Sequence, residues 1–232
     1  MKKKKILFIC GSLNQTTQMH QIAKALPEYD NWFTPYYADG YEKVLVKAGL
    51  AEMTVMGNKL VQRCLAYLHQ QELPIDNGGS RNKYELVVTC SDLIVQKNIR
   101  HKKIVLVQEG MTDPENLVYH LVKTFPVLPR WIAGTSTNGL SQAYQKFCVA
   151  SEGYRDLFVR KGADPSTIRV TGIPNFDHCT KYYDNDFPHK NFVLVCTSDT
   201  RETFRYENRK KFIENALKIA DGRQLIFKLH PN

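Results

Sequence analysis

Short apolar segments alternate with segments of helical period along most of the chain, and this alternation limits the possible folds more than any other feature. The first unit has an apolar strand at residues 6–10, a turn at Gly11-Ser12 and then a helix. The apolar positions of that helix, which share one face, are Met19, Ile22, Ala23 and Leu26. Strands and helices that alternate in this way form a parallel sheet covered by helices on both faces. The sequence therefore predicts a Rossmann-like α/β sheet.

The alternation continues to residue 174. Further strands are expected at residues 32–37, 86–90, 103–107, 147–150 and 168–171. One helix is expected to follow Asn58, and another to run from Ser151, a favourable N-cap, to Gly162, a favourable C-terminal residue. The apolar face of the first of these helices consists of Leu60, Val61, Cys64, Leu65 and Leu68. Residues 76–80 (Asp-Asn-Gly-Gly-Ser) interrupt the pattern and predict a mobile loop.

The tripeptide Asp113-Pro114-Glu115 has the composition of a helix start. It offers a capping acid, a proline at the first helical position and an acid in the first turn. The sequence therefore predicts a helix that begins at this tripeptide. Its buried face is predicted to consist of Leu117, Leu121, Val122 and Phe125.

A domain boundary is predicted after residue 174. Residues 175–190 are polar and aromatic without a clear period, so we interpret residues 1–174 as one domain and 175–190 as a linker. Residues 191–232 then form a new strand–helix–strand unit, with strands at 192–196 and 224–229. One such unit buries too little apolar surface to be a domain. The unit therefore either packs on the first domain or is truncated, and truncation is the simpler interpretation, so we expect an incomplete second Rossmann-like domain. A reading frame that continues for about another 130–170 residues would agree with truncation, whereas a stop codon after Asn232 would favour a binding module.

Composition narrows the class of protein. None of the six cysteines forms a CxxC pair, and several lie in apolar strand patterns, so we expect neither disulfides nor zinc, and a reducing cytoplasm. The net charge of +9 favours an anionic partner. Because the cations are spread along the chain, and are not interleaved with aromatic residues on one face, we exclude nucleic acid. The run at residues 2–5 fits either a solvated end or attraction to an anionic membrane surface.

Polar residues follow three of the predicted strands, and the carboxyl ends of parallel strands form the ligand-binding edge of such sheets. Those after the first strand are Gly11, Ser12, Asn14 and Gln15. They form either a tight turn and nothing more, or one side of a substrate cleft. Asp92 follows residues 86–90 and is either a helix cap or a group that contacts or deprotonates a substrate hydroxyl. Glu109 follows residues 103–107 and is the preferred base, although a register shift of one residue would present Gln108 instead.

A second polar group is expected in the last 42 residues, between the strand at 192–196 and the following helix. Its members are Thr197, Ser198, Thr200 and Arg201. Such a turn presents backbone N–H groups suited to a phosphate, and Arg201 adds a positive charge. Asp199 in the same turn fits a helix cap better than an anion site. Lys228 and His230 flank the end of the next strand and are secondary candidates for the same ligand.

Aromatic residues are concentrated near the second strand. They are Trp32, Phe33, Tyr36, Tyr37 and Tyr41. Such a group either packs in the core or forms a platform on which a sugar stacks.

Five segments in order resemble the GT-B superfamily, in the branch that contains the UDP-N-acetylglucosamine 2-epimerases and related glycosyltransferases. They are residues 6–12 (ILFICGS), 85–92 (ELVVTCSD), 147–153 (FCVASEG), 170–177 (VTGIPNFD) and Arg201-Glu202 together with 228–232 (KLHPN). Each segment is weakly specific, and their order and spacing carry the resemblance. It covers nearly all of the chain and implies an acceptor-side domain followed by the start of a nucleotide-sugar-binding domain.

The chain departs from the epimerase pattern at its acid–base positions. Where hydrolysing 2-epimerases carry Arg-Pro-Glu after the first glycine and then a lysine, this chain has Leu13-Asn14-Gln15 and Gln18. Their His-Arg-Glu-Asn run appears here as residues 200–203 (Thr-Arg-Glu-Thr). Elimination and re-addition at a sugar carbon needs acid–base groups, so these differences argue against epimerisation.

The resemblance therefore implies a metal-independent, cofactor-free glycosyltransferase that transfers a sugar from a nucleotide-sugar, such as a UDP-sugar, to a glycan or lipid-linked acceptor. The implied setting is cell-envelope polysaccharide synthesis, in the cytoplasm or at the inner membrane face. Glu109 or Asp92 would deprotonate the acceptor, and Arg201 with the turn at 197–200 would stabilise the leaving diphosphate. The alternatives are an epimerase-like isomerase or hydrolase, and a non-catalytic binding module that lacks a complete donor site. The 232-residue chain by itself is expected to be inactive.

Overall fold

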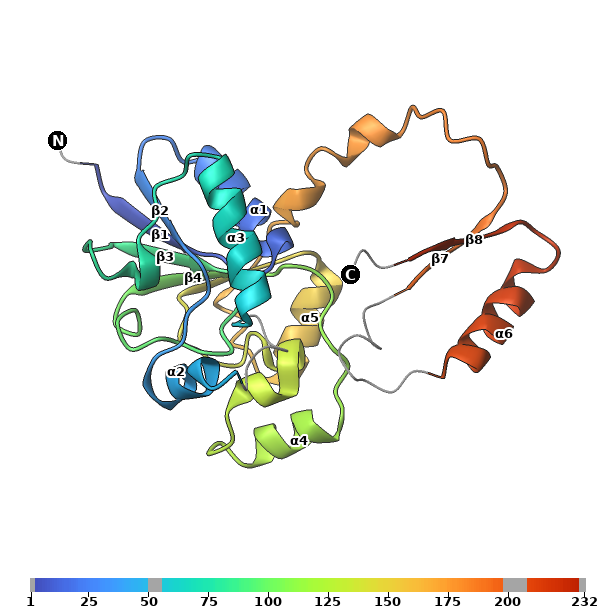
Figure 1. The fold of residues 1–232 in the computed structure, drawn as a ribbon. Helices are drawn as coiled ribbons and strands as arrows, with labels where there is room; N and C mark the ends of the chain where they lie inside the picture. Colours follow the sequence, from blue (N-terminus) through green and yellow to red (C-terminus); the bar gives the residue numbers. More distant parts are fainter. Residues whose placement is uncertain (1–2, 50–55, 198–207, 230–232) are drawn as a thin grey trace. The chain divides into compact units, whose positions relative to one another are not determined.

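A computed structural model of the chain describes residues 3–49, 56–197 and 208–229 (Figure 1). The chain divides into two compact units, Met1–His178 and Cys179–Asn232. No helix in the described ranges is long and apolar enough to cross a membrane.

The first unit is built on a six-stranded sheet in which every neighbouring pair of strands is parallel. Its strands, in spatial order, are β2 (Asp30–Thr34), β1 (Lys5–Ile9), β3 (Leu86–Thr89), β4 (Lys103–Val107), β5 (Lys146–Val149) and β6 (Ile168–Val170). All six predicted strands are present. The chain runs outward from β1 to β2 and then returns to the other side of β1 for β3 to β6. The strand order therefore reverses between β1 and β3, and the carboxyl ends of strands at such a reversal are where ligands bind in open α/β sheets.

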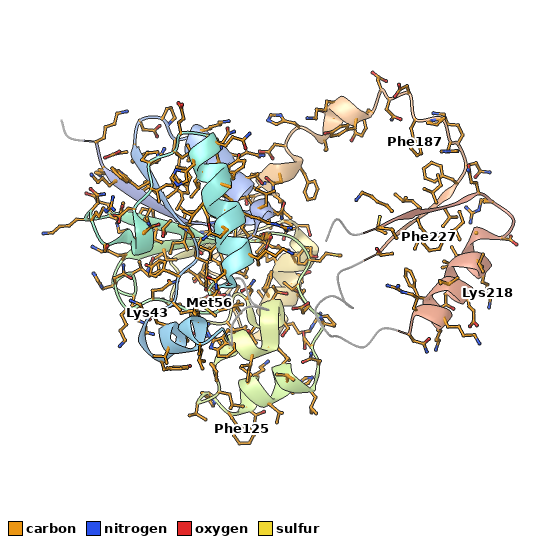
Figure 2. All side chains as sticks on the ribbon, viewed as in Figure 1. Lys43, Met56, Phe125, Phe187, Lys218 and Phe227 are labelled. Atoms are coloured by element: carbon orange, nitrogen blue, oxygen red, sulfur yellow. The ribbon has the colours of Figure 1, made fainter. Side chains whose placement is uncertain are left out.

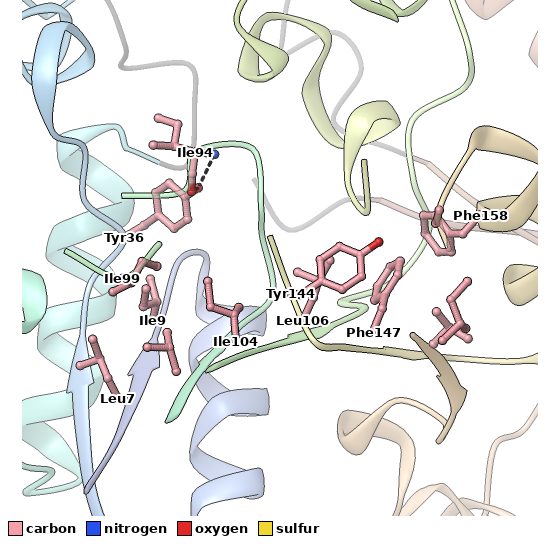
Figure 3. Packing of buried hydrophobic residues seen from close by; sticks show 14 of the residues in the cluster. Leu7, Ile9, Tyr36, Ile94, Ile99, Ile104, Leu106, Tyr144, Phe147 and Phe158 are labelled. Atoms are coloured by element: carbon pink, nitrogen blue, oxygen red, sulfur yellow. Dashed lines mark hydrogen bonds between the residues drawn. The ribbon is translucent and has the colours of Figure 1, made fainter. Parts of the chain in front are cut away.

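Helices cover both faces of this sheet, which confirms the predicted Rossmann-like fold. Successive residues of β1 point to opposite faces, as the two-residue period of a strand requires. Ile6 and Phe8 belong to the core beneath α1 (Leu13–Lys24) and α3 (Asn58–Gln70). Leu7 and Ile9 belong to the core on the other face (Figure 3). This core also contains Tyr144, Phe147 of β5 and Phe158 of α5 (Glu152–Lys161).

The helix predicted from Asp113 begins later than expected. Helix α4 spans Leu117–Thr124, and its N-cap is Asn116, whose side-chain oxygen accepts from the Tyr119 N–H at 3.0 Å. Asp113 instead accepts from the backbone N–H of Thr135 at 3.0 Å. The predicted apolar face is confirmed only at Val122, which is buried together with Tyr119, whereas Leu117, Leu121 and Phe125 are exposed. Figure 2 shows Phe125 at the outer side of α4. The reason is that this short helix packs on one narrow side, against the 3₁₀ segment η2 (Arg130–Thr137).

Of the aromatic residues near β2, Phe33 and Tyr36 are buried in the core, Trp32 and Tyr37 pack against it and Tyr41 is exposed, so they do not share one stacking surface. Phe33 is 1% exposed and stacks on Phe8 with ring centroids 5.3 Å apart. Tyr36 lies in the core on the opposite face of the sheet, where the Ile94 N–H donates to its hydroxyl at 3.1 Å (Figure 3). Burial raises the pKa of Tyr36 to about 12. Tyr41 is exposed and lies at the start of α2 (Gly40–Lys47), a helix that was not among the predicted elements.

The segment predicted to be a mobile loop is a closed turn around a buried carboxylate. Asp76 is fully buried, and its two oxygens accept from the backbone N–H groups of Ser80, Arg81 and Asn82 at 3.0–3.1 Å. The hydroxyl of Tyr84 donates to the same carboxylate at 2.6 Å. Glycines at 78 and 79 have positive φ, which lets the backbone wrap around the acid.

This turn makes stability depend on acid pH. Burial opposes the charge of Asp76, but the hydrogen bonds from Tyr84, Arg81 and Asn82 outweigh burial, so its pKa is lowered from 3.8. A depressed folded-state pKa contributes stability that is complete above about pH 4 and is lost as the pH falls through the folded-state value. We expect Asp76→Asn to lower the free energy of unfolding at pH 7 by about 2–3 kcal/mol. The difference from the unmodified protein, measured by urea denaturation, should shrink below about pH 4. A difference that is constant with pH would contradict this account.

The described residues of the second unit form a strand–helix–strand motif. Strands β7 (Val193–Cys196) and β8 (Leu225–Lys228) pair in parallel, and α6 (Arg209–Ala220) connects them. The residues of α6 that pack inward are Ala216 and Ala220, whereas Leu217 and Ile219 are exposed. A short 3₁₀ turn, η4 (Cys179–Tyr182), precedes this motif.

Candidate functional site

Four of the residues that the sequence singled out meet at the carboxyl edge of the sheet. Glu109 follows β4, and its carboxylate lies at the first turn of α1. Three side chains donate to it: Ser12 Oγ to Oε1 at 2.8 Å, Asn14 Nδ2 to Oε1 at 3.2 Å, and Gln15 Nε2 to Oε2 at 2.6 Å. Glu109 as a whole is half-buried. We call Ser12, Asn14, Gln15 and Glu109 the Glu109 cluster.

The cluster depends on how α1 begins. Ser12 is the N-cap, and its hydroxyl accepts from the Gln15 N–H at 3.2 Å while Gln15 Oε1 accepts from the Ser12 N–H at 3.3 Å. This capping box fixes both side chains, so that each also points a donor at Glu109. The positive end of the helix dipole favours an anion at this position.

Gly11 is required here because of the close approach of Gln15. A Cβ atom at position 11 would lie 1.7 Å from Gln15 Oε1. Gln15 is only 3% exposed, so its side chain has little room to move aside. The Gly11-Ser12 turn is therefore both a tight turn and the support of a polar cluster.

Gln108 is turned inward and holds the neighbouring backbone. It is 4% exposed; its Nε2 donates to Gly110 O at 2.7 Å, and its Oε1 accepts from the Ala150 N–H at 2.9 Å. Gln18 Nε2 donates to the carbonyl of Gln108 at 2.9 Å. The register of β4 thus presents Glu109 to the first turn of α1 and uses Gln108 to fix the backbone behind it.

Asp92 lies apart from the Glu109 cluster and binds a different loop. Its Oδ1 accepts from the Gly139 N–H at 2.8 Å and its Oδ2 from the Ser141 N–H at 2.9 Å. Arg130 Nη1 lies 3.5 Å from the same Oδ2. Asp92 is 4% exposed, and no helix follows β3 directly, so the prediction that it caps a following helix is wrong. These contacts describe a residue that fixes the loop before β5.

Asn175 joins the site and was not a sequence candidate. Its Nδ2 donates to Asn14 Oδ1 at 2.6 Å and to Asn14 O at 3.0 Å. It is the middle residue of the 3₁₀ segment η3 (Pro174–Phe176), inside the segment at 170–177 that carried the resemblance. Its polar side chain just after Gly172-Ile173-Pro174 was the only signal for it in the sequence.

Buried thiols lie beneath the cluster. Cys10 and Cys90 are in the core under α1. Burial raises the pKa of both, and the negative charge of Glu109 adds to the rise at Cys90. They therefore remain protonated at neutral pH and pack as small apolar residues.

Two of the phosphate-site candidates lie on neighbouring strand ends in the second unit. Thr197 follows β7, and its N–H donates to the carbonyl of Lys228, the last residue of β8, at 3.0 Å. The side chain of Lys228 is exposed. Ser198, Thr200, Arg201 and His230 lie outside the described residues. Within the described ranges, no group of three His, Cys, Asp or Glu residues could hold a metal ion.

The first unit is a Rossmann-like α/β domain with a polar cluster at the carboxyl edge of its sheet. No family model and no curated protein matches the sequence. Solved structures do match its fold. A UDP-N-acetylglucosamine 2-epimerase from Rickettsia bellii is 13% identical, with a TM-score of 0.50 over 99% of this chain and 62% of that one. At this identity the likeness concerns the GT-B-like fold alone.

Two further structures are similar to a lesser degree. A UDP-GlcNAc 2-epimerase from Methanocaldococcus jannaschii is 14% identical, with a TM-score of 0.44 over 98% of this chain and 66% of that one. An S. aureus MnaA–UDP co-structure is 14% identical, with a TM-score of 0.48 over 99% and 63%. The chain thus spans about two thirds or less of the length of these three structures.

Proposed function

We propose that this chain is the acceptor-side domain, with the start of the donor-side domain, of a GT-B-type glycosyltransferase that uses a nucleotide-sugar. The observation that carries the proposal is the Glu109 cluster. It supplies one carboxylate at the ligand-binding edge of the sheet, held in place by three donors. A single oriented base is what transfer to an acceptor hydroxyl requires.

The geometry leaves the carboxylate able to act. A carboxylate offers about four lone-pair sites, and three are used by Ser12, Asn14 and Gln15. The remaining site can accept the hydrogen of an acceptor hydroxyl. As that proton moves to Glu109, the hydroxyl oxygen bonds to the anomeric carbon, and the bond from that carbon to the diphosphate breaks. The three donors hold the carboxylate in one orientation, which lowers the entropic part of the barrier.

The second unit would bind the leaving diphosphate. Lys228 and Thr197 stand at the carboxyl ends of two parallel neighbours, which is where ligands bind in such sheets. A lysine there offsets the negative charge that the diphosphate develops. Ser198, Thr200, Arg201 and His230 stay sequence-based candidates for the same role.

Epimerisation is the second candidate, because the Rickettsia bellii structure is that of a UDP-N-acetylglucosamine 2-epimerase. Reversible loss and return of a proton at a sugar carbon needs acid–base groups near the sugar. Glu109 is the only ionisable residue of the Glu109 cluster. The other three members present one hydroxyl and two amides. This composition favours transfer.

The experiment that separates the two uses the full-length product of the gene. It is incubated with each of a panel of UDP-sugars, with and without a cell-envelope glycan and glycolipid extract. We expect release of UDP that depends on the extract, and labelled sugar in the extract. Formation of a new sugar nucleotide without any acceptor would show that the protein is an epimerase and not a transferase. Binding to the extract without turnover of any UDP-sugar would show that the protein is a binding module and not a transferase.

A further inference from the structure

A large cavity lies in the first unit, separate from the Glu109 cluster. Its volume is about 890 Å³, and its walls come from the start of α2, the segment after β3, α4, η2 and the end of α5. No residue of the Glu109 cluster lines it. The volume is at the upper end of the range for small-molecule sites, roughly 300–1,000 Å³.

The charged residues of this cavity are mostly cations. The positively charged side chains are Arg100, Lys123, Arg130 and Lys161, and the acidic one is Glu42. They come from four separate parts of the chain and converge on one space. Cations that line a concave surface attract an anionic ligand.

Arg130 has hydrogen-bonding capacity to spare. Its Nη1 is buried and makes no hydrogen bond with any described residue. This atom faces Asp92, whose Oδ2 lies 3.5 Å away. A guanidinium has five N–H donors in a planar fork that matches a phosphate or carboxylate, so Arg130 can pair with Asp92 through Nη1 and offer its other N–H groups to an oxyanion in the cavity.

Lys161 is a buried cation beside the same cavity. Only 2% of it is exposed, and its ammonium donates to the carbonyl of Ser136. The ammonium also lies 5.2 Å from the ring centre of Tyr119 and 5.6 Å from that of Phe158. Among the described residues it has no ion pair, and burial lowers its pKa. The carboxylates of Glu115, Asp113 and Asp92 act on it only from beyond ion-pair distance, so a bound anion would supply a closer counter-charge.

Much of the remaining wall is apolar, although Thr137, Ser141 and Gln142 also line the cavity. The apolar side chains include Leu93, Val95, Val122, Val127, Leu128, Trp131 and Leu140. Val127 is 88% exposed, so the apolar surface extends to the rim. A free inorganic anion would leave this surface unused, whereas an anion attached to an apolar group would cover it.

We propose that this cavity binds an organic phosphate, that is, a phosphate group attached to an apolar body. The phosphate contacts the guanidinium of Arg130, with Arg100, Lys123 and Lys161 around it. The apolar body lies against Trp131 and the adjoining aliphatic residues. Such a ligand comes from a membrane lipid or from a soluble phosphate ester, and these share the chemistry that the cavity recognises.

The test uses the fluorescence of Trp131. The chain has two tryptophans, so Trp32→Phe leaves Trp131 as the only reporter. This protein is titrated with hexyl phosphate, with hexanol and with inorganic phosphate. We expect a saturable change with hexyl phosphate and a far weaker response to the other two. The double change Arg100→Gln with Lys123→Gln, at two exposed positions, should weaken hexyl phosphate binding by about tenfold.

The matched control is Lys59→Gln, which removes an exposed lysine of α3 that does not line the cavity. It should leave the affinity unchanged. Equal responses to hexanol and hexyl phosphate would overturn the proposal, as would unchanged affinity in the double variant or an equal loss in the control. Sedimentation with vesicles of phosphatidic acid or of phosphatidylcholine then identifies the source. If the protein pellets with phosphatidic acid vesicles but not with phosphatidylcholine vesicles, the ligand is a membrane lipid. If it binds hexyl phosphate but pellets with neither kind of vesicle, the ligand is a soluble phosphate ester.

Discussion

Replacing Glu109 with glutamine is expected to lower kcat/KM for sugar transfer by roughly 10²–10⁴-fold, the usual contribution of a general base. The amide cannot take the proton from the acceptor hydroxyl. It also places an NH₂ group among three donors that now point at a carboxylate. The loss should appear in kcat more than in KM, because the proton transfer occurs in the transition state. The measurement is acceptor-dependent UDP release by the full-length gene product, with circular dichroism to verify folding.

Asn14→Ala is the matched control for this prediction. It removes the longest of the three hydrogen bonds to Glu109, together with the hydrogen bond that Asn14 Oδ1 accepts from Asn175, and leaves the carboxylate in place. One hydrogen bond corresponds to a loss of about 2–10-fold. If Glu109→Gln folds normally and loses no more activity than Asn14→Ala, Glu109 is not the base and only caps α1.

Replacing Asp92 with alanine is expected to lower the free energy of unfolding by about 3–5 kcal/mol, the cost of breaking a buried ion pair from one side. Two backbone N–H groups, of Gly139 and Ser141, lose their acceptor, and the guanidinium of Arg130 loses its nearest carboxylate. Gly139 adds to the effect: its φ is +82°, and it packs so closely on Phe147 that the loop has little freedom to rearrange. Urea denaturation at pH 7 measures the change.

Two companion variants make this result specific. Asp156→Ala removes an exposed carboxylate of α5 and should change stability by no more than about 0.5 kcal/mol. Asp92→Asn retains one acceptor oxygen and should cost about 2 kcal/mol. If Asp92→Asn were as stable as the unmodified protein and lost as much turnover as Glu109→Gln, the role of base would pass from Glu109 to Asp92.

Much of the fold was predictable because its signals are local. The strand at Lys103–Val107 was predicted at its observed bounds, and Ser151 and Gly162 begin and end α5 as their cap preferences indicate. The start of α4 was not predictable in the same way. Asp113 has the composition of a cap, but it bonds to Thr135 of η2, so Asn116 caps the helix. The capping preference of Asp113 did not decide the start of the helix, because its carboxylate accepts a hydrogen bond from Thr135, 22 positions further along the chain.

The site was predictable only as a set of candidates. A strand-end position is visible in the sequence, which is why Ser12, Asp92 and Glu109 were chosen together. Their surroundings are not visible: Asp92 binds a loop 47–49 positions further along the chain, and Glu109 faces a helix 94–97 positions back. Both acids follow buried strands, so periodicity alone cannot separate their roles.

The sequence by itself determined the class of fold, because the periods of strands and helices are written in consecutive residues and bury apolar surface in only a few layered ways. It also determined the polar residues at the strand ends. The tertiary structure alone decided which of these meet. The order β2-β1-β3-β4-β5-β6 and the register of β4 bring Glu109 to Ser12 and Gln15 and turn Gln108 inward. Those choices follow from the packing of the whole sheet, which no short segment of the sequence encodes.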